Sequence, residues 1–139
     1  ILNKYKILYY NLVKEVFEKV ISEQFELKKQ DENLATYFGV RRPEDGRINW
    51  NWQKERIRNW VRAQSYPYPG AFTFCNGQKI TIDKVEESSL GFNYNIINGT
   101  ILEVNPNLII KTQNGALIIK DYREKFQFIK GEKLGNYEK

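Results

Sequence analysis

Apolar residues recur every three or four positions from residue 1 to about residue 24, and this spacing predicts one amphipathic helix. The apolar stripe consists of Ile1, Tyr5, Leu8, Tyr9, Leu12, Val13, Val16, Phe17 and Val20. Lysine and glutamate side chains occupy the other side, and neither proline nor glycine interrupts the pattern. Because so apolar a face needs a partner surface, we expect it to pack on protein outside this chain or on a second copy in a two-fold homodimer.

The pattern becomes polar after this helix. Residues 25–46 predict a connector, with a candidate short strand at 36–38. The sequence Pro43-Glu44-Asp45-Gly46 predicts a turn at the end of the connector, because proline and glycine punctuate regular structure.

A second, shorter helix is predicted from Trp52 to Ala63, with Asn51 as its N-cap. Its apolar side and the residue just ahead of it are formed by Ile57, Trp60, Val61 and Trp50. We expect these four side chains to join the helix to the following strands as one core. The sequence Tyr66-Pro67-Tyr68-Pro69-Gly70 ends the helix, because a residue before proline is pushed into an extended conformation, and a cis peptide is a candidate here.

From residue 71 the apolar period changes to two, which is typical of strands. Five short strands are predicted, at 71–75, 78–85, 100–104, 108–111 and 116–120. The dipeptide Asn76-Gly77 favours a tight hairpin between the first two strands, and residues 112–115 form a second hairpin turn. The predicted fold class is α+β: an N-terminal helix, then a short helix leading into a small open antiparallel β-barrel of the oligonucleotide-binding type.

The amino-acid composition limits which kinds of catalytic and metal sites the chain can contain. The 139 residues carry a net charge of +5, one cysteine (Cys75), no methionine and no histidine. A lone cysteine excludes an internal disulfide and a cysteine-based zinc site, and the lack of histidine removes the commonest acid–base catalyst at neutral pH. We find neither a signal peptide nor an apolar run that could cross a bilayer, so we expect a cytoplasmic protein without a membrane partner. Without a methionine, the chain is expected to be a piece of a longer protein.

Three motifs stand in a fixed order along the chain. They are Arg42-Pro43-Glu44-Asp45-Gly46-Arg47-Ile48-Asn49-Trp50, Ile57-Arg58-Asn59-Trp60-Val61-Arg62-Ala63 and Tyr66-Pro67-Tyr68-Pro69-Gly70-Ala71-Phe72. With the later strand patterns at 99–102, 108–110 and 114–119, the chain resembles the C-terminal subdomain of the folate-dependent formyltransferase family. That family includes methionyl-tRNA formyltransferase and the formyltransferases acting on nucleotide-linked amino sugars.

The first and third motifs look most like the sugar-nucleotide branch, such as the enzymes that formylate UDP-4-amino-4-deoxy-arabinose for lipopolysaccharide or other surface polysaccharide biosynthesis. The tRNA branch usually has a shorter loop and lacks the proline-glycine-alanine-phenylalanine run. Here Asn49 replaces the aspartate that commonly precedes Trp50. The alternative assignment is the C-terminal tRNA-binding domain of a methionyl-tRNA formyltransferase.

The resemblance implies transfer of a formyl group from 10-formyltetrahydrofolate to a primary amine, by an asparagine, a histidine and an aspartate of an N-terminal domain. None of those motifs is in this sequence, so no catalytic or folate-binding residue is assigned, and the chain alone is expected to be inactive. Residues 1–40 would be the helix and connector from that domain, and 41–139 the barrel subdomain. The folate is then a co-substrate of the full-length enzyme only, and no metal site is expected because the acidic residues lack ligand spacing.

The candidate substrate-binding residues are Arg41, Arg42 and Arg62, which could hold a phosphate of a nucleotide-linked sugar. A solvated loop is the competing interpretation for Arg41 and Arg42. For the pair Arg58 and Arg62, four apart on one helix, we favour an anchor on the turn through Asp45 or Glu44.

The three tryptophans, Trp50, Trp52 and Trp60, could form a stacking platform, but core packing is favoured. An RNA-binding module is a further alternative because of the barrel and the positive charge. Nucleic acid is the less favoured partner, because the strands show no clear alternation of aromatic and basic residues. A structural or dimerising module is also compatible with the formyltransferase resemblance.

Overall fold

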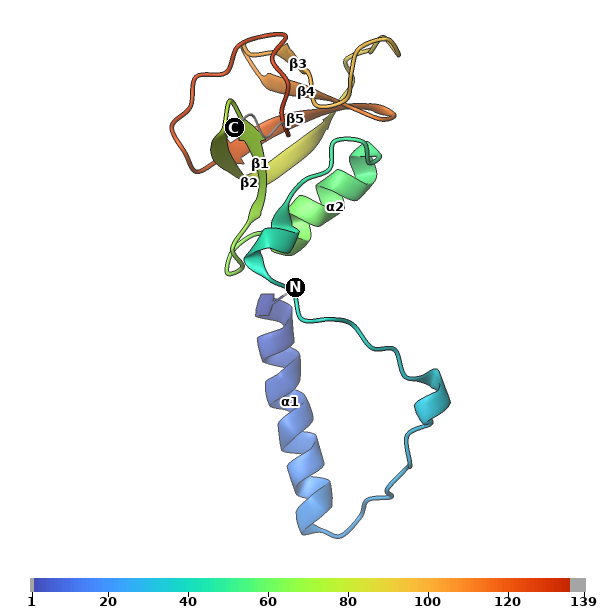
Figure 1. The fold of residues 1–139 in the computed structure, drawn as a ribbon. Helices are drawn as coiled ribbons and strands as arrows, with labels where there is room; N and C mark the ends of the chain where they lie inside the picture. The colour runs from blue at the N-terminus through green and yellow to red at the C-terminus, as the bar shows by residue number, and fades with distance from the viewer. Residues whose placement is uncertain (1, 136–139) are drawn as a thin grey trace. The chain divides into compact units, whose positions relative to one another are not determined.

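The computed structural model describes residues 2–135, and the chain forms two compact units, Ile1–Gly39 and Val40–Lys139. The first unit holds helix α1, Leu2–Ile21, drawn in blue in Figure 1, and a single-turn 3₁₀-helix, Glu32–Leu34. The amphipathic helix is confirmed for the described residues, although it ends three residues before the predicted end; Ile1 lies outside them. The predicted strand at 36–38 is wrong, because these residues form no strand and find no pairing partner in their unit.

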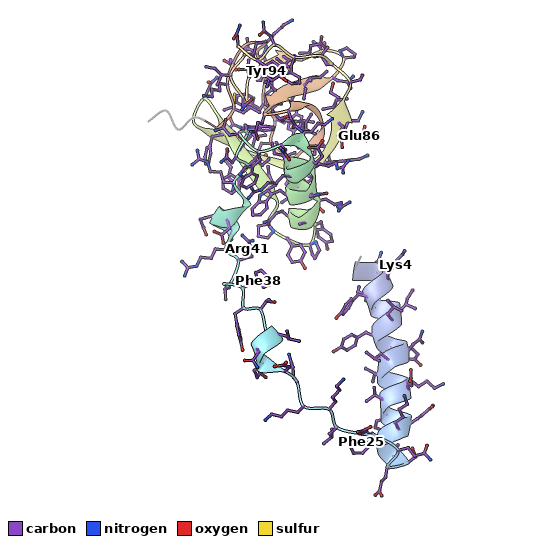
Figure 2. All side chains as sticks on the ribbon, turned by 90° about the vertical axis from the view of Figure 1, so that its right-hand side faces the viewer. Lys4, Phe25, Phe38, Arg41, Glu86 and Tyr94 are labelled. Carbon is purple, nitrogen blue, oxygen red and sulfur yellow. The ribbon has the colours of Figure 1, made fainter. Side chains whose placement is uncertain are left out.

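The first unit does not cover its own apolar residues. The exposed apolar side chains of α1 include Leu8, Leu12, Val16, Phe17 and Val20. Phe25 and Phe38, both labelled in Figure 2, are exposed along the connector. The stripe is therefore as apolar and continuous as the sequence indicates, and its expected homodimer stays a prediction. No helix in the described part of the chain is long and apolar enough to cross a membrane.

The second unit contains a 3₁₀-helix, one α-helix and five strands. Its elements are the 3₁₀-helix Pro43–Gly46, α2 Lys54–Gln64, β1 Ala71–Cys75, β2 Gln78–Ser88, β3 Ile101–Glu103, β4 Leu108–Thr112 and β5 Gly115–Tyr122. All pairings are antiparallel, in the spatial order β1-β2-β5-β4-β3, and the sheet curls into a half-barrel beside α2 (Figure 1). The predicted α+β class and barrel are confirmed.

Two hairpins form where the turn residues predict them. Asn76 and Gly77 both have positive φ, at 48° and 75°, which is the backbone that such a tight turn requires. Strand β2 runs three residues beyond its predicted end, whereas β3 covers only three of its five predicted residues. The Tyr66–Pro67 bond is cis, as considered, and the Asn105–Pro106 bond is also cis, which the sequence did not indicate.

A closing segment, residues 131–135, links the two edge strands of this sheet. The Leu134 amide donates to Gly99 O at 2.9 Å, just ahead of β3. The Gly135 amide donates to Phe74 O of β1 at 2.7 Å. On the same edge of β1, the Ile48 amide donates to Phe72 O at 2.7 Å. The sheet alone is open, and these short segments complete the barrel wall.

Helix α2 starts two residues later than predicted, and Asn51 is not its N-cap. The helix follows Gln53, whose side chain makes no capping hydrogen bond. The Lys54 amide instead donates to Asn114 Oδ1, 2.8 Å away in the β4–β5 turn. Asn114 also donates to the Glu55 carboxylate at 2.9 Å. A residue sixty positions away therefore satisfies an amide that a local cap would normally satisfy.

The core unites α2 with the barrel, as predicted. Trp50 is only 4% exposed, and its indole Nε1 donates to Thr73 Oγ1 at 2.9 Å. Ile57 and Val61 of α2 are fully buried in the same cluster. Trp60 is half-buried and packs at the edge of this cluster.

We expect Trp50→Ala to lower the free energy of unfolding by about 3–5 kcal/mol, because a large buried side chain is lost. Trp60→Ala should lower it by less, because part of that ring already meets water. Urea denaturation of the 139-residue chain followed by circular dichroism would measure both values. Tyr94→Ala is the control, because this ring is 86% exposed (labelled in Figure 2). An unchanged stability of Trp60→Ala would contradict its part in the core.

Candidate functional site

The candidate substrate-binding residues Arg41, Arg42 and Arg62 all belong to the second unit. All three residues are exposed, and no ion pair among the described residues involves any of them. The Arg41 guanidinium lies 5.2 Å from the centre of the Trp60 ring, whereas the Arg42 backbone amide donates to Asp45 Oδ2 at 2.8 Å. Their role in substrate binding stays a prediction.

The expected anchor between Arg58 or Arg62 and the turn is wrong for Arg58. Its guanidinium pairs with Glu87 of β2, which also accepts an ion pair from Lys54 at 3.0 Å. Asp45 of the turn accepts its hydrogen bond from Arg42 of the same turn. Glu87 therefore holds α2 against the barrel, and only Arg62 of this pair remains available to an external anion.

A row of stacked aromatic and cationic groups lies along α2, and the sequence did not single it out. Trp52 and Trp60 meet edge to face, with ring centres 5.3 Å apart. The Arg56 guanidinium covers the Trp52 ring at 4.1 Å, as Arg41 covers Trp60. The signal in the sequence was the spacing of four between Arg56 and Trp60, which places both side chains on one side of α2, and Trp52 lies just before the helix begins. Arg41 and Arg56 are both exposed, so the row offers two guanidinium groups to solvent.

The loop around Pro67 borders a cleft of about 570 Å³. Its lining includes Tyr66, Tyr68, Asp83, Asp121 and Arg123. Arg123 binds both carboxylate oxygens of Asp83, at 2.7 and 2.6 Å, and its third nitrogen donates to Pro69 O at 3.1 Å. The Asp83 hydrogen bonds raise the pKa of Arg123, so the guanidinium is a permanent tie between β2, β5 and this loop.

A second cleft, of about 430 Å³, lies where the closing segment meets residues 47–51. Its polar lining residues are Arg47, Asn49, Asn51, Asn98 and Lys133. Arg47 donates to Gly135 O at 2.8 Å across this junction. Among residues 2–135, the polar side chains that line this cleft are cations and amides, which suits an anion.

The side chains that could perform covalent or acid–base chemistry are poorly placed for it. Cys75 is fully buried, and burial together with the Glu132 carboxylate raises the pKa of its thiol to about 11. Among residues 2–135, no three carboxylate, cysteine or histidine side chains form a group that could hold a metal ion.

The second unit is thus a small barrel that residues 131–135 close and that one helix, α2, packs against. Residues 41–135 match the family model described as formyl transferase, C-terminal domain. The chain therefore belongs to the formyltransferase C-terminal-domain family.

A solved structure gives the same fold. A multiply substituted variant of HypX from Aquifex aeolicus resembles this chain with a TM-score of 0.58 and 22% sequence identity. The match covers 82% of this chain and 20% of the HypX chain. At this identity the likeness shows the fold alone, and the matched region is a fifth of that protein's length.

Thiol reactivity should report the burial of Cys75. Reagents attack the thiolate, and a rise in pKa from 9.0 to about 11 leaves about a hundredth as much of it near neutral pH. We expect the native thiol to react with a disulfide reagent at least about a hundredfold more slowly than the urea-unfolded thiol at pH 8. Equal rates in the two states would show that Cys75 is accessible.

Proposed function

We propose that this chain is the C-terminal, non-catalytic part of a formyltransferase that transfers a formyl group from 10-formyltetrahydrofolate to the amine of a nucleotide-linked amino sugar. The family match across residues 41–135 is the observation that carries the formyltransferase part. The substrate class rests on the motifs of the two loops that precede β1. Surface polysaccharide or lipopolysaccharide biosynthesis is the setting that such a substrate suggests.

The chemistry of formyl transfer supports a non-catalytic role for this chain. The acceptor amine must lose a proton, and the oxyanion of the tetrahedral intermediate needs a donor beside that base. This sequence has no histidine, and its one thiol is buried. We therefore assign folate binding and proton transfer to another domain of the same enzyme, with 10-formyltetrahydrofolate as its co-substrate.

The glycines of the two loop motifs have a structural reason that is independent of substrate. A Cβ on Gly46 would come within 2.7 Å of Gly70 O, and one on Gly70 within 2.5 Å of the Thr81 side chain. Gly70 also has a φ of 102°, which favours glycine. The motifs thus lock two loops together ahead of β1. The sugar-nucleotide assignment rests on the resemblance of these motifs, and the exposed Arg41, Arg42 and Arg62 are its candidate phosphate ligands.

The second candidate is tRNA binding, and the row of Arg41, Trp60, Trp52 and Arg56 is the observation that favours it. Guanidinium groups on a helix surface suit phosphodiester oxygens. Arg56 and Arg41 already lie against Trp52 and Trp60, so a base would have to displace them, which makes this candidate the weaker one.

The first test is formylation itself. We expect the chain to show no transfer from 10-formyltetrahydrofolate to an amino sugar nucleotide, even at high protein concentration, because it has no histidine and none of the family's folate-site motifs. Product would be measured by mass spectrometry. Turnover that a substitution in this chain abolishes would contradict the non-catalytic role.

The second test separates the two substrate classes. We expect tRNA to bind more weakly than micromolar at physiological salt, because no dense basic block is present. Fluorescence anisotropy at low and physiological salt would measure the affinity and its salt slope. The double variant Arg41→Gln, Arg56→Gln removes two positive charges from the row. Its control, the double variant Lys125→Gln, Lys130→Gln, removes two positive charges outside the row. Micromolar binding that only the first variant weakens would favour the tRNA candidate.

A further inference from the structure

A buried lysine beside the cleft of about 430 Å³ has no role in formyl transfer. Strand β4 consists of three apolar residues followed by Lys111 and Thr112, and Lys111 is only 2% exposed. Its ammonium donates to Thr112 O and to Asn98 Oδ1, the latter at 3.1 Å, and lies 4.3 Å from the centre of the Phe92 ring. No carboxylate of the described residues forms an ion pair with it. A buried cation without a counter-ion is costly, so its placement calls for a reason.

The Lys111 ammonium fixes the orientation of Asn98. An ammonium only donates, so the oxygen of the Asn98 amide must face it, and the nitrogen must face the other way. That nitrogen donates to Asn51 Oδ1 at 3.1 Å. Asn51 must therefore turn its own amide nitrogen away from Asn98, and both residues line the cleft.

The third asparagine of the cleft is fixed in the same way. Asn49 Oδ1 accepts the Asn51 backbone amide at 2.9 Å, so the Asn49 nitrogen is left for another partner. Each of the three side-chain oxygens thus accepts a hydrogen bond within the protein, and this fixes which way each amide nitrogen faces. Side-chain N–H groups of Asn49, Asn51 and Asn98 remain for a ligand that accepts hydrogen bonds.

The charges around the cleft also favour a ligand that accepts hydrogen bonds. Arg47 and Lys133 line it, the Lys111 ammonium contacts Asn98, and none of the described residues that line it carries a carboxylate. The neighbouring Glu132 is engaged elsewhere, because its carboxylate accepts from Asn76 at 3.0 Å and from the Cys75 thiol at 3.7 Å. Trp50 and Leu134 supply apolar walls. Several donors, net positive charge and a volume of this size suit a phosphorylated small molecule.

We propose that this cleft binds a phosphate group, with Asn49, Asn51 and Asn98 as donors and Lys133 and the buried Lys111 as the source of positive potential. The phosphate is either the free ion or part of a nucleoside diphosphate, whose remaining atoms the cleft has room for. The buried Lys111 then has two effects on binding: it orients the amide of Asn98, and it adds positive charge close to the site. The proposal is independent of the formyl transfer discussed above.

The binding test uses the 139-residue chain and its side-chain amide NMR signals. Inorganic phosphate, uridine diphosphate and uridine are titrated separately at constant ionic strength. We expect phosphate or uridine diphosphate to shift the Asn51 and Asn98 signals at millimolar or lower concentration, whereas uridine does not. A response to phosphate alone identifies the free ion as the ligand, and a response to uridine diphosphate identifies the nucleotide. No response to either, or an equal response to uridine, overturns the proposal.

Asn98→Asp is the decisive variant. The aspartate keeps an oxygen for Lys111, so the barrel should fold, but it replaces donors in the cleft with a negative charge. We expect the dissociation constant for the responding ligand to rise at least about tenfold, since a charge-assisted hydrogen bond is lost. Asn93→Asp is the matched control, because it adds the same charge to the same loop while keeping its oxygen for the Asn95 amide.

A second variant keeps the result interpretable if Asn98→Asp does not fold. Lys133→Gln changes an exposed side chain of the cleft, so its fold should be unaffected, and we expect binding to weaken severalfold. Lys130→Gln removes an equal, exposed charge nearby in the sequence and should leave the affinity unchanged. If Asn98→Asp and Lys133→Gln both bind with the affinity of the parent chain, the ligand binds elsewhere and the proposal is overturned.

Discussion

The free edge of β1 is the constraint on which the second unit depends. A five-stranded sheet in the order β1-β2-β5-β4-β3 leaves β1 and β3 without neighbours on one side. Residues 131–135 hydrogen-bond near both edges, and residues 47–48 pair with β1 as well. Two stretches from opposite ends of the unit therefore meet at one junction. Trp50 is buried there, and the asparagine cleft lies beside it, so the geometry of that cleft exists only when the barrel is closed.

The attachment of α2 shows the same dependence on distant residues. Asn114, in the turn between β4 and β5, accepts the first amide of the helix, and Glu87 at the end of β2 pairs with Lys54 and Arg58. Both ties are largely exposed, so the ion pairs themselves add little to stability. Their effect is to set the angle of the helix over the barrel. The buried contacts of Ile57 and Val61 then supply most of the energy.

Local patterns explain which parts of this structure the sequence could predict. The period of two, the Asn76-Gly77 turn and the prolines at 67 and 69 are local signals, and the elements they predict are present. The start of α2 was missed because its cap comes from Asn114, and the strand at 36–38 was wrong because a short apolar run forms a strand only where a neighbouring strand can pair with it. The partner of Arg58 was missed for a similar reason. Glu87 is 29 positions away, and only the fold brings the two together.

The candidate sites also differ in whether a local sequence signal could reveal them. Arg41, Arg42 and Arg62 were found from residue type and motif, and the structure shows all three exposed. The asparagine cleft could not be found that way, because its donors come from residues 49–51, 98 and 133 and none is unusual alone. One signal was local, namely a lysine in the otherwise apolar run Leu108-Ile109-Ile110-Lys111. A strand buried along its whole length has no solvent face for an ammonium, so such a lysine must have a partner inside the protein. Here that partner is the Asn98 amide and not a carboxylate. A carboxylate would neutralise the positive charge, whereas the amide leaves it in place and turns its own N–H groups away from the lysine.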